Sequence, residues 1–284
     1  MSPPPTSQRM KQNITPYERL YALTAGILCA PAGRRRLALS FAYGLLCHTV
    51  FALAVIAMVV AMFFGMSESF GRLPAPWYFV VNAMLIVQFP LAHSLLLSKR
   101  GRRLLERLAP GSHGKTLATT TFAIIASMQL LALFTLWTPS GILWWRAEGT
   151  TFFLLCGLYA ASWLLLIKAS YDAGAEVQSG ALGWMSLAQD IRPVFPDMPT
   201  HGLFRFVRQP IYVAFALTLW TVPVWTPDQL VLALVFTTYC VVAPRLKERR
   251  FRMTYGQRFS DYQAKVPYMI PSFRRRLKNG RNHS

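Results

Sequence analysis

Long apolar runs alternate with short basic segments along most of this chain. Six runs stand out, at about residues 39–65, 76–97, 116–138, 150–168, 210–226 and 228–244. A helix needs roughly 20 apolar residues to cross a hydrocarbon core of about 30 Å. The pattern therefore predicts an all-α, polytopic helical membrane protein with about six transmembrane helices. The last two runs are short and are separated by Pro223 and Pro227, which predicts a tight helical hairpin.

The first 38 residues do not follow this pattern. Residues 1–19 are polar and rich in proline, which is typical of a loosely ordered segment. The apolar run Leu20–Ala32 is too short to span, and the basic triplet Arg34–Arg36 argues against a cleaved signal peptide. We predict a cytosolic segment over 1–38 that partly lies on the inner leaflet, one transmembrane domain over 39–272, and a basic tail over 273–284.

Basic residues are distributed unevenly between the two ends of the predicted helices. The net charge is +19, and 28 of the 30 Lys and Arg residues fall before residue 39, within 98–115 or 168–209, or after residue 244. Arg72 and Arg146 fall on the other side. Because basic residues near helix ends stay in the cytosol, both termini are predicted to be cytosolic. A charge this large can indicate nucleic-acid binding, but its regular placement beside apolar runs indicates anionic membrane lipid as the partner.

Cysteine and histidine residues form no pattern typical of a metal site. The four cysteines, at 29, 47, 156 and 240, are far apart, and the five histidines include no HExxH or paired arrangement. We therefore expect no bound metal ion.

The predicted cytosolic face carries the most distinctive group of polar residues. Arg205, Arg208 and Gln209 precede the fifth apolar run, and Glu248 follows the sixth as the one carboxylate of a strongly cationic stretch. Arg208 lies just before Pro210, at a predicted helix start whose free N–H groups favour an anion. Together these residues suit a ligand that carries both a carboxylate and an ammonium group. The alternative is that the basic residues only anchor the helix ends and that Glu248 relieves their repulsion.

An ordered motif runs through the same region. Its residues are Gly202, Arg208-Gln-Pro-Ile-Tyr212, Lys247-Glu248 after two apolar runs, Tyr255-Gly256, Tyr262 and Val266-Pro267. This series resembles the C-terminal signature of the integral membrane methyltransferases related to isoprenylcysteine carboxyl methyltransferase. One of these elements alone would carry little weight, but the match keeps the family's order from end to end.

The resemblance implies that residues 201–272 bind S-adenosylmethionine. The residues it assigns to cofactor binding are Gly202, Arg208, Gln209, Pro210, Tyr212, Glu248, Tyr255 and Tyr262. Two positions depart from the family's pattern. Gln209 replaces a His, so it can donate and accept hydrogen bonds but cannot titrate. Lys247 replaces the first of two Glu residues, which leaves the contact with the cofactor's amino group to Glu248.

The N-terminal half looks most like the bacterial methanethiol S-methyltransferase branch of this superfamily. The segment from Gln88 to Ser94, which includes His93, resembles a Gln-His-Ser element of that branch, and Asp172 and Gln178 match a motif after its fourth helix. The resemblance makes His93 and Asp172 candidate catalytic groups that lower the pKa of an acceptor thiol, with Gln178 and Arg205 as substrate contacts. The alternatives are a packed histidine for His93 and a helix cap for Asp172.

These features predict an S-adenosylmethionine-dependent methyltransferase of a bacterial inner membrane, with a small or lipophilic thiol as the favoured acceptor. Methyl transfer to a thiolate depends on proximity and desolvation more than on acid–base groups, which suits a chain without a catalytic-triad motif. Two alternatives stay open. One is a carboxyl or lipid-amine methyltransferase, and the other is a non-catalytic membrane protein that has kept the scaffold.

Overall fold

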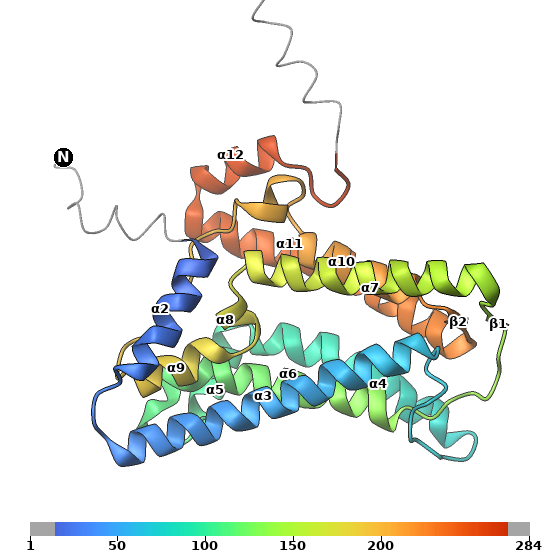
Figure 1. The fold of residues 1–284 in the computed structure, drawn as a ribbon, viewed down its shortest axis with the longest axis horizontal. Helices are drawn as coiled ribbons and strands as arrows, with labels where there is room; N and C mark the ends of the chain where they lie inside the picture. The colour runs from blue at the N-terminus through green and yellow to red at the C-terminus, as the bar shows by residue number, and fades with distance from the viewer. Residues whose placement is uncertain (1–14, 272–284) are drawn as a thin grey trace, which may run out of the picture.

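A computed structural model of the protein describes residues 15–271. Its elements in chain order are α2 (Pro16–Leu28), α3 (Arg34–Phe63), α4 (Trp77–Leu96), α5 (Lys99–Leu108), η1 (Gly111–His113), α6 (Gly114–Leu136), β1 (Trp145–Arg146), α7 (Gly149–Asp172), α8 (Ala175–Gln178), α9 (Ala181–Ala188), η2 (Gly202–Arg205), α10 (Pro210–Trp220), β2 (Val224–Trp225), α11 (Pro227–Tyr255) and α12 (Gln257–Lys265). Figure 1 shows the long helices running in similar directions, with β1 and β2 at the right-hand end and α2 and α9 at the left. The predicted basic tail at 273–284 lies outside the described residues.

Five helical segments are long and apolar enough to cross a membrane. They are Arg34–Phe63, Trp77–Leu96, Gly111–Leu136, Gly149–Asp172 and Pro227–Tyr255. Each coincides with one of the predicted apolar runs, so the prediction of a polytopic helical membrane protein is confirmed. Helix α3 begins earlier than its run, because Arg34–Arg36 form its first turn.

The fifth predicted run, at 210–226, forms a helix that is shorter than expected. Helix α10 has 11 residues, or about 16 Å at 1.5 Å per residue, so it covers only part of the hydrocarbon thickness. The rest of the run leaves the helix: Val224 and Trp225 form β2, which pairs antiparallel with β1. The predicted hairpin between α10 and α11 is present, but its first arm ends at Trp220.

Hydrogen bonds to main-chain carbonyl oxygens connect the segments at the end of the molecule that carries the strands. Thr226 Oγ1 donates to the carbonyl oxygen of Gly65 after α3 (2.5 Å), and the amide of Gly71 donates to the carbonyl oxygen of Trp137 after α6 (3.0 Å). Gly65 has φ +61°, and a Cβ there would come within 2.8 Å of a main-chain oxygen, so this close approach requires glycine. The segments that bear Arg72 and Arg146 both join this end, as the charge distribution predicts.

Apolar side chains divide between a core and a surface suited to lipid. The core cluster joins α3, α4, α6, α7, α10 and α11 and includes Met62, Leu133, Leu219 and Phe236, each at most 2% exposed. Helix α7 instead leaves large side chains such as Phe153 and Leu164 exposed. Within a bilayer these positions face hydrocarbon, so exposure carries no penalty of the kind that it would in water.

Helix α11 continues well past the predicted end of its apolar run. It passes through Pro244 and ends only at Gly256, which has φ +52°. The chain then folds back as α12, and the ring of Phe259 packs edge-on against Phe251 with centroids 5.8 Å apart. This return brings α12 over the polar end of α11.

Helix α2 packs against the segment that follows α7. Arg19 forms an ion pair with the buried Glu176 of α8 (3.0 Å), and Gln189 Nε2 donates to the carbonyl oxygen of Leu23 (2.9 Å). Thr15 and Glu18 form a capping box that starts the helix. The position of this segment on the inner leaflet stays a prediction.

Candidate cofactor site

The strongest polar cluster among the described residues joins the start of α10 to the polar end of α11. Arg208 Nε donates to Glu248 Oε1 (2.8 Å), and the two side chains are 13% and 11% exposed. Gln209 Nε2 also donates to Oε1 (2.9 Å), while Gln263 Nε2 of α12 donates to Oε2 (2.8 Å). The predicted convergence of Arg208, Gln209 and Glu248 is therefore present, and both oxygens of the carboxylate are occupied.

The chain after α12 is hydrogen-bonded to the same cluster. Arg208 donates through its main-chain amide to the carbonyl oxygen of Pro267 (2.9 Å) and through Nη1 to that of Val266 (2.5 Å). The Tyr262 hydroxyl donates to the carbonyl oxygen of Phe204 (2.7 Å), and burial raises the pKa of this hydroxyl. Because Arg208 bonds both to Glu248 and to this segment, one side chain couples α10, α11 and the C-terminal return.

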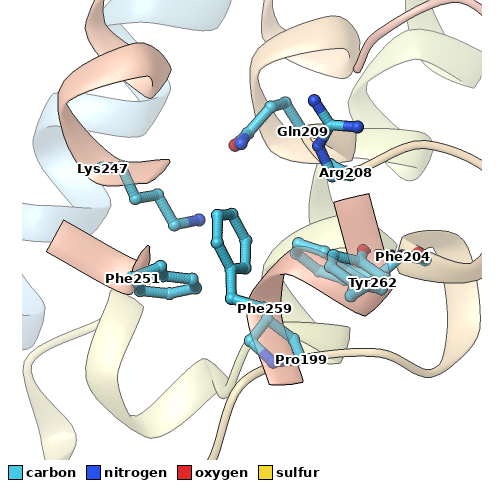
Figure 2. Close-up of a pocket in the computed structure, with 8 residues that line it drawn as sticks. All are labelled: Pro199, Phe204, Arg208, Gln209, Lys247, Phe251, Phe259 and Tyr262. Atoms are coloured by element: carbon cyan, nitrogen blue, oxygen red, sulfur yellow. Dashed lines mark hydrogen bonds between the residues drawn. The ribbon is translucent and has the colours of Figure 1, made fainter. Parts of the chain in front are cut away.

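A small cavity adjoins the cluster, with a volume of about 10 Å³, which is room for one water molecule. Figure 2 shows the residues that line it: Pro199, Phe204, Arg208, Gln209, Lys247, Phe251, Phe259 and Tyr262. Four of the eight are aromatic and two are cationic. Glu248 is not among them, since its carboxylate is turned toward Arg208, Gln209 and Gln263. The cavity is far smaller than the roughly 300–1,000 Å³ typical of ligand pockets, because α12 lies close over it.

Asp172 contacts the turn that precedes the site. Its carboxylate pairs with Lys168 and accepts a hydrogen bond from the main-chain amide of Leu203 in η2 (2.9 Å). Gly202 has φ +57°, and a Cβ there would come within 2.2 Å of that carboxylate. Asp172 and Gly202 thus fit together and hold η2, which carries the cavity residue Phe204.

The other predicted site residues lie outside the cavity lining. His93, in the last turn of α4, packs between Phe89 and Phe122 at ring centroid distances of 5.1 and 4.9 Å. Its Nδ1 atom is buried without a hydrogen-bond partner among residues 15–271. Arg205 and Gln178 are exposed. The structure therefore does not bring these three together with Glu248, and their roles stay predictions.

Three further motif residues support the site from outside. Pro210 is buried at the first turn of α10, where a missing N–H is tolerated. Tyr212 lies two residues further on the same turn and is half-buried. Tyr255 packs edge-on against the cavity residue Phe251, with centroids 5.4 Å apart.

The sequence interpretation missed several residues that the fold adds to the cluster. Phe259 and Gln263 belong to α12, and they reach the cavity and Glu248, respectively, only because the chain reverses at Gly256. Phe259 and Tyr262 are spaced i, i+3, which places them on one helix face, and this spacing was a usable signal. Lys247 was noted only as a departure from the family, yet it lines the cavity beside Phe204 and Phe251.

Comparison with known proteins bears on what such a cluster does. The chain is 26% identical over 203 residues to the methanethiol S-methyltransferase of Pseudomonas deceptionensis, covering 70% of this chain and 75% of that protein. It is 26% identical over 235 residues to the enzyme of the same name from Crocosphaera subtropica, covering 81% and 90%. It is also 29% identical over 127 residues to Nurim of Xenopus laevis, covering 42% and 45%.

No family profile matches the chain, and no solved structure matches it. The class defined by the fold is a polytopic helical membrane protein with a polar cluster at one end of the α10–α11 hairpin. Within that class, the resemblance to membrane methyltransferases is confirmed, since relatives named methanethiol S-methyltransferase match most of the chain at modest identity.

Proposed function

We propose that this protein is an integral membrane methyltransferase that uses S-adenosylmethionine and favours a small or lipophilic thiol of the methanethiol type as acceptor. The observation that carries the proposal is the meeting of Arg208, Gln209, Glu248 and Tyr262 beside one cavity. These residues come from separate segments of the chain. All four are among the residues that the resemblance to membrane methyltransferases assigns to cofactor binding. The names of the relatives point to the same chemistry.

The residues at the cavity fit the groups of this cofactor. Phe204, Phe251, Phe259 and Tyr262 offer ring faces for an adenine or a sulfonium cation, and Gln209 and Lys247 offer polar contacts for an amino-acid end. When bound, the cofactor supplies a methyl group activated by a positively charged sulfur. Since the cavity is small, binding requires α12 to move outward, and its return would exclude water from the reacting groups.

The acceptor chemistry asks little of the protein beyond positioning. A thiolate is a strong nucleophile once it is formed and desolvated, which suits a site placed at the end of a membrane hairpin. A lipophilic acceptor can approach from the bilayer side. His93 and Asp172 stay our candidates for groups that act on the acceptor, although Asp172 already holds η2. We further propose a bacterial inner-membrane location with the site on the cytosolic side.

Two other functions compete with this proposal. A carboxyl or lipid-amine methyltransferase would use the same cofactor site with a different acceptor. A non-catalytic membrane protein is favoured by one observation: Lys247 brings a positive charge to a cavity that would receive a cationic sulfur. The relatives named as methyltransferases favour the enzyme over this second reading.

Isothermal titration of the purified protein with S-adenosylmethionine separates the enzymes from the non-catalytic scaffold. A screen of acceptors with methanethiol, a farnesylated cysteine and a phospholipid amine then separates the enzymes from one another. We expect saturable binding, and methylation of the thiol faster than of the other two. Absence of binding would contradict all the enzyme assignments, whereas binding with transfer to the carboxyl or amine acceptor would contradict only the thiol.

A further inference from the structure

The charge in the cavity is unbalanced at Lys247. Among the eight lining residues, the cations are Arg208 and Lys247, and no carboxylate lines the space. Arg208 is already neutralised by Glu248. The Lys247 ammonium forms no ion pair or hydrogen bond within residues 15–271, and the groups it contacts there are the rings of Phe204 (5.8 Å) and Phe251 (5.4 Å). The half-buried ammonium is thus held against ring faces, without a hydrogen-bond acceptor among residues 15–271.

A second unused group faces the same space. The Gln209 side chain is 3% exposed, and its Oε1 atom has no hydrogen-bond partner among the described residues. The orientation of this amide is fixed, because only its NH₂ group can donate to the Glu248 carboxylate. Its oxygen must therefore point away from Glu248. In Figure 2 the ends of the Gln209 and Lys247 side chains approach the same part of the cavity.

These two groups are complementary to the two charges of an amino acid. A ligand carboxylate would accept from the Lys247 ammonium, and a ligand ammonium would donate to Gln209 Oε1. Because a buried polar atom such as Gln209 Oε1 is normally paired, one zwitterion would satisfy this oxygen and pair with the Lys247 ammonium at once. Glu248 has no free acceptor site for the ammonium in this arrangement, since its two oxygens already accept four hydrogen bonds from Arg208, Gln209 and Gln263, which is as many as a carboxylate accepts.

We propose that Lys247 binds the carboxylate of the ligand's amino-acid end and that Gln209 Oε1 accepts from its ammonium group. This inference rests on the proposed function, in which the ligand is S-adenosylmethionine, and it names the residue that selects the carboxylate. The replacement of a Glu by Lys247 then reverses the polarity of one contact and leaves the binding of an amino acid intact. Glu248 does not line the cavity, and it positions Arg208 and Gln209 by accepting their hydrogen bonds.

The test compares two probes that differ only in the carboxylate. They are S-adenosylhomocysteine and its decarboxylated analogue, S-adenosyl-3-thiopropylamine, titrated into the full-length protein in detergent. We expect the wild type to bind S-adenosylhomocysteine about 10- to 100-fold more tightly, the ratio that corresponds to one hydrogen bond to a charged group. Lys247→Gln is expected to remove this preference by weakening only the first probe, with affinity for the analogue unchanged within about twofold.

Two further variants keep the result interpretable. Lys247→Arg retains the positive charge and is expected to retain the preference, which guards against loss of folding in Lys247→Gln. Arg249→Gln removes a positive charge from an exposed neighbour on α11 and is expected to behave as the wild type. A general electrostatic effect would instead move Lys247→Gln and Arg249→Gln equally and would overturn the inference.

The outcomes distinguish this inference from the function beneath it. Binding of both probes with a preference that survives in Lys247→Gln would overturn the role of Lys247 and leave the methyltransferase assignment standing. Tighter binding of both probes by Lys247→Gln would overturn it as well, since the lysine would then be occupying the ligand's place. Absence of binding of either probe by the wild type would overturn the proposed function and this inference together.

Discussion

Helix α11 carries one buried carboxylate near each end, and the two do different work. Asp228 and Glu248 are both 8% exposed, and the helix separates them by about 30 Å at 1.5 Å per residue. Asp228 accepts from neutral donors, Trp137 Nε1 (3.1 Å) and both the amide (2.9 Å) and hydroxyl (2.6 Å) of Ser140. Glu248 accepts from a guanidinium and two amides.

The helix itself explains part of this difference. Asp228 lies in the first turn, where the helix dipole favours a negative charge. Glu248 lies about two turns before the other end of α11, where the dipole gives no such support, and Arg208 supplies the compensating positive charge. Both carboxylates are therefore buried and well hydrogen-bonded, although Asp228 has a structural role and Glu248 belongs to the candidate site. What marks the Glu248 end is the adjoining cavity, where Gln209 Oε1 and the Lys247 ammonium have no polar partner among residues 15–271.

We expect the two ends of α11 to lie on opposite sides of the membrane. Reporter fusions test this topology with an all-or-none signal. Reporter fusions at Ser69 and Ser140 are expected to report the exterior. Of the 30 Lys and Arg residues, only Arg72 and Arg146 lie at that end, and basic residues concentrate on the cytosolic side. Fusions at Pro110 and at the C-terminus are expected to report the cytosol. Alkaline phosphatase and green fluorescent protein activities provide the measurement. A cytosolic signal at Ser140 would refute the topology.

Matched neutral substitutions at the two carboxylates sharpen the comparison. We expect Glu248→Gln to weaken the binding of S-adenosylmethionine by about 1.5–3 kcal/mol, because the hydrogen bonds that orient Arg208 and Gln209 lose their charged acceptor. Asp228→Asn is expected to leave this affinity unchanged and to lower the free energy of unfolding by about 1–3 kcal/mol. Calorimetric titration measures the first quantity and unfolding in detergent the second. Equal affinity in the wild type and Glu248→Gln would remove Glu248 from the site.

Gln209 gives the smallest expected effect and tests the departure from the family's histidine. Gln209→Ala removes one donor to Glu248 and the unpaired oxygen, and it is expected to lower cofactor affinity by about 0.5–1.5 kcal/mol, the usual net value of a neutral hydrogen bond. Gln209→His restores a donor, so affinity and turnover are expected to be retained or raised. Both are measured beside the wild type. If neither substitution changes binding, Gln209 is no cofactor contact.

Apolar runs were enough to predict most of the membrane fold. They did not predict that α10 ends at Trp220. Hydrophobicity indicates burial in the bilayer and does not distinguish a helix from the extended residues at 224–225 that pair with β1. They also ended α11 too early. Arginine and lysine are good helix formers, so the helix continues to Tyr255 through residues that lie beyond the apolar run.

The site was predicted only as far as the motif extends. The meeting of Arg208, Gln209 and Glu248 followed from an ordered series of residues on a hairpin. The closing contribution of Phe259 and Gln263 could not be predicted, since it depends on the reversal at Gly256. His93, chosen by residue type and an isolated match, packs among aromatic rings away from the cavity. A residue type without spatial partners was therefore a weaker guide than a motif in order.

The most direct test of the central claim follows the methyl group itself. Purified protein in lipid vesicles is supplied with methanethiol and S-adenosylmethionine carrying a trideuterated methyl group, and the headspace is analysed by gas chromatography with mass detection. The account predicts dimethyl sulfide that carries the label, at a rate that Glu248→Gln reduces and Asp228→Asn does not. Wild-type protein that forms no labelled dimethyl sulfide, under conditions in which it binds the cofactor, would contradict the assignment of a methanethiol-type thiol as acceptor.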